Sequence, residues 1–165
     1  MQKIRRQLSN EEILLKLSTR CATCEYAPSD VYQKAVKYGA SPYDAQQIVD
    51  KLIDENFINT ERYVRAFVND KLTFSHWGKL KISAALRQKK IPPSLIARQL
   101  DTIPQDQYLD ILRNALTAKL KQTNEPDPYK LTRKLLSFAA SRGFEPSLAY
   151  DITGQILHDM PDTEL

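Results

Sequence analysis

The sequence predicts an all-helical protein built from tandem three-helix repeats. Apolar residues recur at three- and four-residue steps along the chain, and no run alternates strictly between apolar and polar residues as a half-buried strand would. The nine prolines fall between these apolar stripes or at their first turns, where a helix tolerates a residue without an N–H donor. We therefore expect helices and no sheet.

The helical stripes follow one another along the chain. Their apolar residues are Ile13, Leu14 and Leu17; Tyr63, Val64, Phe67 and Val68; Ile82, Ala85 and Leu86; Tyr108, Ile111, Leu112, Ala115 and Leu116; and Leu131, Leu135, Phe138 and Ala139. Side chains at these spacings lie on one face of a helix, which then packs against its neighbours. Residues suited to capping a helix precede several of the predicted starts, namely Ser9, Ser41 and Thr60.

Three prolines mark an internal repeat. Pro42, Pro93 and Pro146 are 51 and 53 residues apart, and aligning the chain on them superposes apolar positions before and after each proline. Each copy has a helix, a one-turn break and a helix that begins at proline, and the 51-residue separation of Ser9 and Thr60 adds one more helix to the unit. Repeats of this size bury their apolar faces against their neighbours. The pattern predicts an elongated array of three tandem three-helix repeats, about nine helices in all.

The repeats have expected boundaries. We place repeat 1 at residues 1–58, a basic repeat 2 at 59–103, repeat 3 at 104–158 and an acidic tail at 159–165. Inside repeat 3, the polar and proline-containing segment 121–128 predicts a mobile linker.

The net charge of +4 is concentrated in the middle of the chain. Residues 62–98 carry nine basic side chains and one acidic side chain, Asp70, whereas the segments before and after have balances of −1 and −3. The basic residues are Arg62, Arg65, Lys71, Lys79, Lys81, Arg87, Lys89, Lys90 and Arg98. A helix from Thr60 places Arg62 and Arg65 opposite its apolar stripe, and the next helix groups further cations beside its own stripe. This distribution favours binding to a polyanion or to an acidic protein surface.

The sequence offers little that points to catalysis. None of the four glycines has a phosphate-cradling spacing, which excludes a P-loop and a dinucleotide fingerprint. Cys21 and Cys24 have the spacing of half a zinc site, but no second cysteine pair exists, and two small residues near a helix end are the simpler interpretation. His76 has no nucleophile or carboxylate partner nearby in the sequence. We expect no catalytic residue, no metal and no cofactor.

The sequence also bears on where the protein acts. The basic N-terminal stretch is not followed by an apolar segment, and no apolar run approaches the roughly 20 residues of a membrane span. Two cysteines cannot staple a domain of this size. We expect a cytoplasmic monomer without a membrane partner.

Two stretches, Asn56 to Val68 and Trp77 to Ile91, together resemble the signature of the RecX family of bacterial recombination regulators. The family pattern is a glycine-aromatic-aliphatic-Asp-Asp turn, an amphipathic helix and then Gly-x-x-x-Ile-x-x-x-Leu-x-x-x-Gly-Ile. The second part is matched here by Gly78, Ile82, Leu86 and Ile91, and the segment from Arg142 to Phe144 is similar to the family's Arg-Gly-Phe ending. The chain departs from the pattern at four positions. They are Asn59 and Thr60 in place of the turn aspartates, Ala85 in place of an acidic residue, and Lys90 in place of a glycine.

The resemblance implies a non-enzymatic regulator of homologous recombination and the SOS response. It implies binding to the RecA recombinase filament, inhibition of its ATPase, strand-exchange and coprotease activities, and some affinity for single- or double-stranded DNA. On this hypothesis Trp77 and Gly78 set the angle between the two basic helices, and the contact residues are Arg62, Arg65, Lys71, Trp77, Gly78, Lys79, Lys81, Arg87, Lys89 and Lys90. Two alternatives stay open: a stand-alone, sequence-tolerant DNA-binding protein, and a helical scaffold for an unrelated acidic protein.

Overall fold

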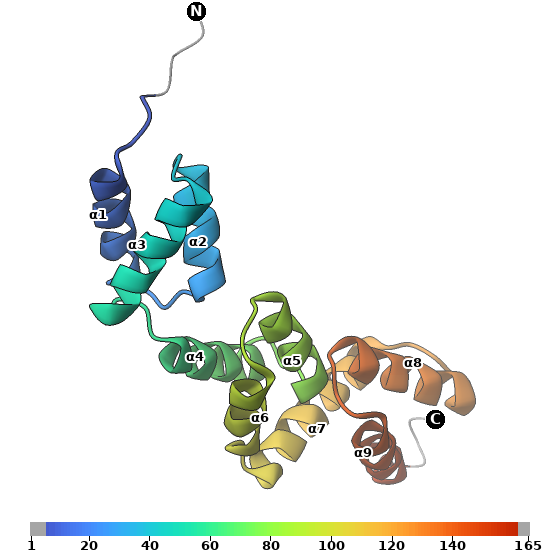
Figure 1. The fold of residues 1–165 in the computed structure, drawn as a ribbon. Coiled ribbons are helices and arrows are strands. Elements are labelled where there is room, and N and C mark those ends of the chain that lie inside the picture. Colours follow the sequence, from blue (N-terminus) through green and yellow to red (C-terminus); the bar gives the residue numbers. More distant parts are fainter. Residues whose placement is uncertain (1–5, 162–165) are drawn as a thin grey trace, which may run out of the picture. The chain divides into compact units, whose positions relative to one another are not determined.

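The computed structural model describes residues 6–161, and this range contains nine α-helices and no strand, as the apolar periodicity predicts (Figure 1). The helices are α1 (Asn10–Cys21), α2 (Pro28–Lys37), α3 (Pro42–Asp54), α4 (Thr60–Thr73), α5 (Lys79–Gln88), α6 (Pro93–Asp101), α7 (Gln105–Gln122), α8 (Pro128–Ser141) and α9 (Pro146–His158). Of the expected acidic tail at 159–165, residues 162–165 lie outside the described residues, as do residues 1–5 of the basic N-terminal stretch.

Two of the three expected capping residues are confirmed. The Ser9 hydroxyl accepts a hydrogen bond from the Glu12 N–H while the Glu12 carboxylate accepts one from the Ser9 N–H, and Ser41 accepts from the Asp44 N–H. The prediction for Thr60 is wrong, because Thr60 is already the first residue of α4 and the Asn59 side chain accepts from the Arg62 N–H at 2.9 Å. Both residue types cap helices well, so local preference alone does not separate them.

Proline opens five of the helices, since the first helical position needs no N–H donor. The loop expected at 121–128 is shorter than predicted, because Lys121 and Gln122 continue α7 as its last turn. The remaining residues connect to α8 through Asp127, whose carboxylate accepts from the Tyr129 and Lys130 N–H groups. Glu125 also forms an ion pair with Lys134 at 2.8 Å.

The three repeats end a helix in the same way. Gly39, Lys90 and Gly143 each stand three residues before an aligned proline, and their φ angles of 108°, 60° and 84° are all left-handed. The residue after each of them is buried: Ala40, Ile91 and Phe144. A left-handed residue stops the helix and directs the next side chain into the core. Lys90 adopts this conformation although only glycine does so without strain.

The chain divides into two compact units, and the division falls within α4. The first unit comprises Met1–Ala66 with Gln88–Pro92, and the second comprises Phe67–Arg87 with Pro93–Leu165. In the first unit α1, α2 and α3 pack on one another around a buried core. Its members include Ile13, Leu17, Val31, Ile48 and Leu52.

In the second unit α7, α8 and α9 pack around Tyr108, Leu112, Leu116, Leu135 and Phe144. The Tyr108 ring lies 5.5 Å from the Phe144 ring, centre to centre, in a tilted aromatic pair. Its hydroxyl accepts from the Lys79 N–H at 3.0 Å and donates to the Glu145 carboxylate at 2.6 Å. Burial and, next, the hydrogen bond to Glu145 raise the pKa of Tyr108 well above its usual value, so this hydroxyl stays a donor across the neutral range.

Within the second unit, the start of α5 rests on the turn after α8. The Gly78 N–H donates to the Arg142 carbonyl at 2.7 Å, and the Leu80 N–H donates to the Gly143 carbonyl at 3.0 Å. A Cβ on Gly78 would lie 2.3 Å from the Gly143 carbonyl oxygen, closer than any atom can approach without displacement. The two backbones therefore meet directly, and Gly78 is required because it has no side chain.

Alanine substitutions at two glycines distinguish the cost of this close backbone contact from the ordinary effect of replacing glycine in a helix. Gly78→Ala should destabilise the protein by about 3 kcal/mol, because backbone rather than a flexible side chain must move. The matched control is Gly154→Ala inside α9, where an added Cβ meets nothing within 4 Å and alanine should stabilise by about 0.5–1 kcal/mol. Urea unfolding measures both values, and equal effects at the two glycines would contradict the assignment.

A glycine at position 90 should increase the stability of the protein, whereas replacing Gly78 should decrease it. Lys90→Gly should stabilise the protein by about 1 kcal/mol, because glycine adopts the left-handed φ of 60° without strain. The same substitution at Lys51, an exposed position inside α3, should destabilise by about 1 kcal/mol. Thermal and urea unfolding of both variants check the sign, and a loss of stability on Lys90→Gly would refute the helix-ending role.

Candidate interaction surface

The ten residues expected to make contacts are divided between the two units. Arg62, Arg65, Lys89 and Lys90 belong to the first unit. The second unit holds Lys71, Trp77, Gly78, Lys79, Lys81 and Arg87.

Two of the first-unit cations hold the fold together. The Arg62 guanidinium reaches the Glu25 carboxylate at 2.8 Å and also donates to the Asn56 side chain and carbonyl, each at 3.1 Å. Lys89 pairs with Asp30 at 2.8 Å, and its carbonyl accepts from the Ser29 hydroxyl at 2.7 Å. Because both ion pairs are half-buried, these charges are largely compensated inside the unit and less available to a partner.

Trp77 lies between two lysines in the second unit. The ammonium groups of Lys71 and Lys81 lie 4.7 and 4.5 Å from its ring centre, and Lys81 also donates to the Ser141 carbonyl at 3.2 Å. The Lys79 ammonium lies 4.9 Å from the Tyr108 ring centre. A lysine over an aromatic ring packs its aliphatic stem against neighbouring apolar groups and directs its ammonium group toward solvent.

Trp77 and Gly78 occupy the loop before α5. The structure places Gly78 against Gly143, as described above, and the Arg142 guanidinium donates to the Ser75 carbonyl in the same loop at 2.8 Å. These contacts hold α5 on the turn after α8. That Trp77 and Gly78 set the angle between two basic helices stays a prediction.

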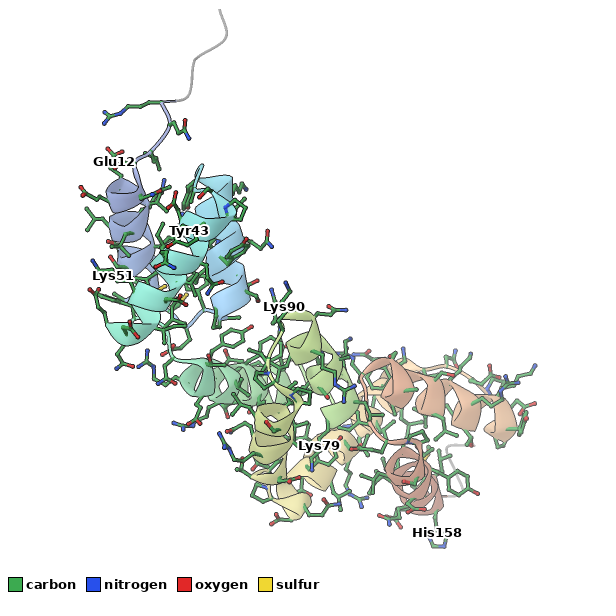
Figure 2. The ribbon with its side chains drawn as sticks, viewed as in Figure 1. Glu12, Tyr43, Lys51, Lys79, Lys90 and His158 are labelled. Atoms are coloured by element: carbon green, nitrogen blue, oxygen red, sulfur yellow. The ribbon has the colours of Figure 1, made fainter. Side chains whose placement is uncertain are left out.

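Three of the expected contact residues are exposed and make no ion pair within residues 6–161: Arg65, Arg87 and Lys90. Arg65 lies in α4, Arg87 lies in the last turn of α5, and Lys90 projects from the loop that follows (Figure 2). A cation without a partner loses little on binding an anion, because no existing ion pair must be broken. These three are the expected contact residues that the described part of the chain leaves free, Arg65 and Lys90 in the first unit and Arg87 in the second.

The sequence interpretation overlooked a second group of cations. Lys119, Lys130, Arg133 and Lys134 line a groove between α7 and α8 in the second unit. The net balance of −3 after residue 98 concealed them, because acidic side chains elsewhere outnumber the basic ones. The signal that would have found them is the i, i+3, i+4 spacing of the last three, which places them together on a helix.

Cys21 is the last residue of α1, and Cys24 follows in the loop after it. Both are free, Cys21 buried and Cys24 exposed, and burial raises the pKa of the Cys21 thiol. Residues 6–161 contain no cluster of three or more histidine, cysteine, aspartate or glutamate residues that would hold a metal ion. None of the helices described combines the length and apolar character needed to cross a membrane.

Comparison with known proteins gives matches to two family models. Residues 59–100 match the one described as RecX, second three-helix domain, and residues 105–152 match RecX, third three-helix domain. Together they cover more than half of the chain.

Curated relatives agree with these matches. A regulatory protein RecX of Clostridium botulinum (strain Eklund 17B / Type B) is 28% identical to this chain, over 96% of it and 74% of the relative. That of Clostridium tetani is 29% identical, over 69% of this chain and 53% of its own length. The chain therefore spans about half the length of some relatives and most of others.

Two solved structures have the same fold. A crystal structure of a regulatory protein RecX superposes with a TM-score of 0.75 at 18% identity, over 88% of this chain and 73% of that one. RecX from Lactobacillus salivarius superposes with a TM-score of 0.74 at 17% identity, over 91% of this chain and 95% of that one. Nine helices in the described range, two RecX domain models and these relatives agree, and the chain belongs to the RecX family of non-enzymatic regulatory proteins.

Proposed function

We propose that this chain binds the RecA nucleoprotein filament and inhibits its ATPase, strand-exchange and coprotease activities, and thereby regulates homologous recombination and the SOS response. One observation carries the proposal beyond family membership. Arg65, Arg87 and Lys90 lie within the segment that matches the second RecX domain, and they are exposed and make no ion pair with any residue from 6 to 161. A nucleoprotein filament offers phosphates and acidic side chains to such cations.

Regulation of this kind needs no catalytic group. A protein that binds one conformational state of a filament more tightly than the others increases the population of that state. If the favoured state hydrolyses ATP slowly, binding alone lowers turnover. The amount of inhibition then depends on the difference in affinity between states, and hence on contacts made by the free cations.

A second candidate function uses the same residues without recombinase. A stand-alone, sequence-tolerant DNA-binding protein needs a basic surface and no base-reading elements, and the lysines on Trp77 and Tyr108 add to the positive charge. It predicts tight binding to DNA alone with a steep dependence on salt. The RecA proposal instead predicts an effect on ATPase at protein concentrations where free DNA is not yet bound.

Charge reversal at two free cations tests the proposal. Arg87→Glu combined with Lys90→Glu should raise the concentration needed for half-maximal inhibition of the RecA ATPase on single-stranded DNA by about tenfold or more, equivalent to about 1.4 kcal/mol. Lys16→Glu combined with Lys37→Glu is the matched control, because both lysines are exposed on α1 and α2 and the net charge changes equally. The control should inhibit like the unmodified protein.

Three results would contradict this expectation in different ways. No effect of the unmodified protein on ATPase at low salt would refute RecA regulation. Equal inhibition by both double variants would show that Arg87 and Lys90 are not contacts. Binding to DNA alone, combined with no effect on the RecA ATPase, would favour the stand-alone DNA-binding protein.

A further inference from the structure

The groove between α7 and α8 is the second basic feature of the chain. It has a volume of about 840 Å³ and is built entirely within the second unit, from the last turns of α7, the following loop and the exposed side of α8. Its polar lining includes Lys119, Gln122, Asn124, Lys130, Arg133 and Lys134. The candidate residues between 62 and 90 contribute nothing to this lining.

Part of the positive charge in the groove is compensated within the chain, because the Glu125 carboxylate interacts with both Lys134 and Lys130. Glu125 neutralises Lys134 at 2.8 Å. Lys119 lies 5.5 Å from the Phe138 ring centre and Arg133 lies 5.9 Å from that of Tyr129, contacts that orient a cation and leave its charge in place. Lys130 is exposed and makes no ion pair within the described residues.

The start of α8 is capped from within the chain, because the Asp127 carboxylate accepts from the Tyr129 and Lys130 N–H groups. Lys130 is in the first turn of α8, which contains no acidic residue, and Arg133 and Lys134 follow in its first half. The helix dipole disfavours positive charge at that end and attracts anions to it. Asp127 and Glu125 supply negative charge at this end, and Lys119, Lys130 and Arg133 still make no ion pair within the described residues.

The spacing fits an extended anion rather than a single small one. Lys130, Arg133, Lys134, Ser137 and Ser141 recur at three- and four-residue steps, so they follow one side of α8. At about 1.5 Å per residue this ridge is about 16 Å long. One strand of a duplex carries a charge about every 3.4 Å along the helix axis, so the ridge matches about five phosphates.

The residues that line the groove favour a nucleic acid over an acidic protein as the ligand. Amide and hydroxyl groups interleaved with lysine and arginine are the usual contacts of phosphate oxygens. A protein partner is anchored instead by apolar and aromatic side chains in desolvated pockets, and Phe138, half-buried, is the one apolar residue in this lining. We infer that the α7–α8 groove binds the phosphate backbone of a nucleic-acid strand, independently of the cations at 65, 87 and 90.

Direct binding of the full chain to a fluorescent oligo(dT) strand, with no recombinase present, tests the inference. Lys130→Gln combined with Arg133→Gln should weaken binding by about tenfold at low salt. Each lost contact lowers the slope of log affinity against log salt by about 0.7 for a single strand, so the slope should fall by about 1.4. A duplex of equal length, assayed in parallel, shows whether one strand suffices.

Two further variants make the result specific. Lys16→Gln combined with Lys37→Gln removes the same charge from α1 and α2, and Arg87→Gln combined with Lys90→Gln removes it from two of the expected contact residues. Thermal unfolding of every variant verifies that the exposed substitutions leave the fold intact. The inference requires a lower salt slope in the groove variant than in the Lys16/Lys37 control.

The inference is overturned if the unmodified protein binds neither strand nor duplex at low salt. It is also overturned if the groove variant keeps the unmodified affinity and slope, including the case in which only the Arg87/Lys90 variant loses them. Because no RecA is present, these outcomes are independent of the ATPase experiment. A result that refutes RecA regulation can therefore be distinguished from a result that refutes nucleic-acid binding by the groove.

Discussion

The backbone contact between Gly78 and Gly143 is the constraint on which the second unit depends. Helix α5 has no acidic residue in its first turn, and its early N–H donors are satisfied from distant parts of the chain. The carbonyls of Arg142 and Gly143 and the hydroxyl of Tyr108 accept them. An unsatisfied donor at a helix start away from solvent is costly, so this contact holds the loop of Trp77, the start of α5 and the partly buried Tyr108–Glu145 pair together.

The charges of the middle repeat have two different roles. Arg62 and Lys89 stabilise the first unit through half-buried ion pairs, whereas Arg65, Arg87 and Lys90 are exposed and unpaired in the described range. A partner that recognises charge is bound mainly by the second kind, since breaking an internal pair to form an external one gains little. A regulator that acts by binding alone therefore depends on fewer residues than its composition suggests.

Lys90 combines a structural cost with an available charge. It stands at the left-handed helix end where the other two repeats have Gly39 and Gly143, and the RecX pattern also has glycine there. Local strain without a local benefit is typical of positions that serve binding. The strained residue is one of the three free cations, which is why it has a central place in the proposed contact with the filament.

The sequence by itself determined the helices, the repeat and the places where helices begin at proline, because these depend on short-range periodicity and on the missing N–H of proline. It also located the excess of charge between residues 62 and 98. Only the tertiary structure decided which cations are paired, that Asn59 rather than Thr60 caps α4, and that residues of α7 and α8 line an open basic groove. Glu25 and Asp30 are far in sequence from Arg62 and Lys89, and Gly78 is far from Gly143. Such pairs become neighbours only when helices pack, and no local pattern encodes them.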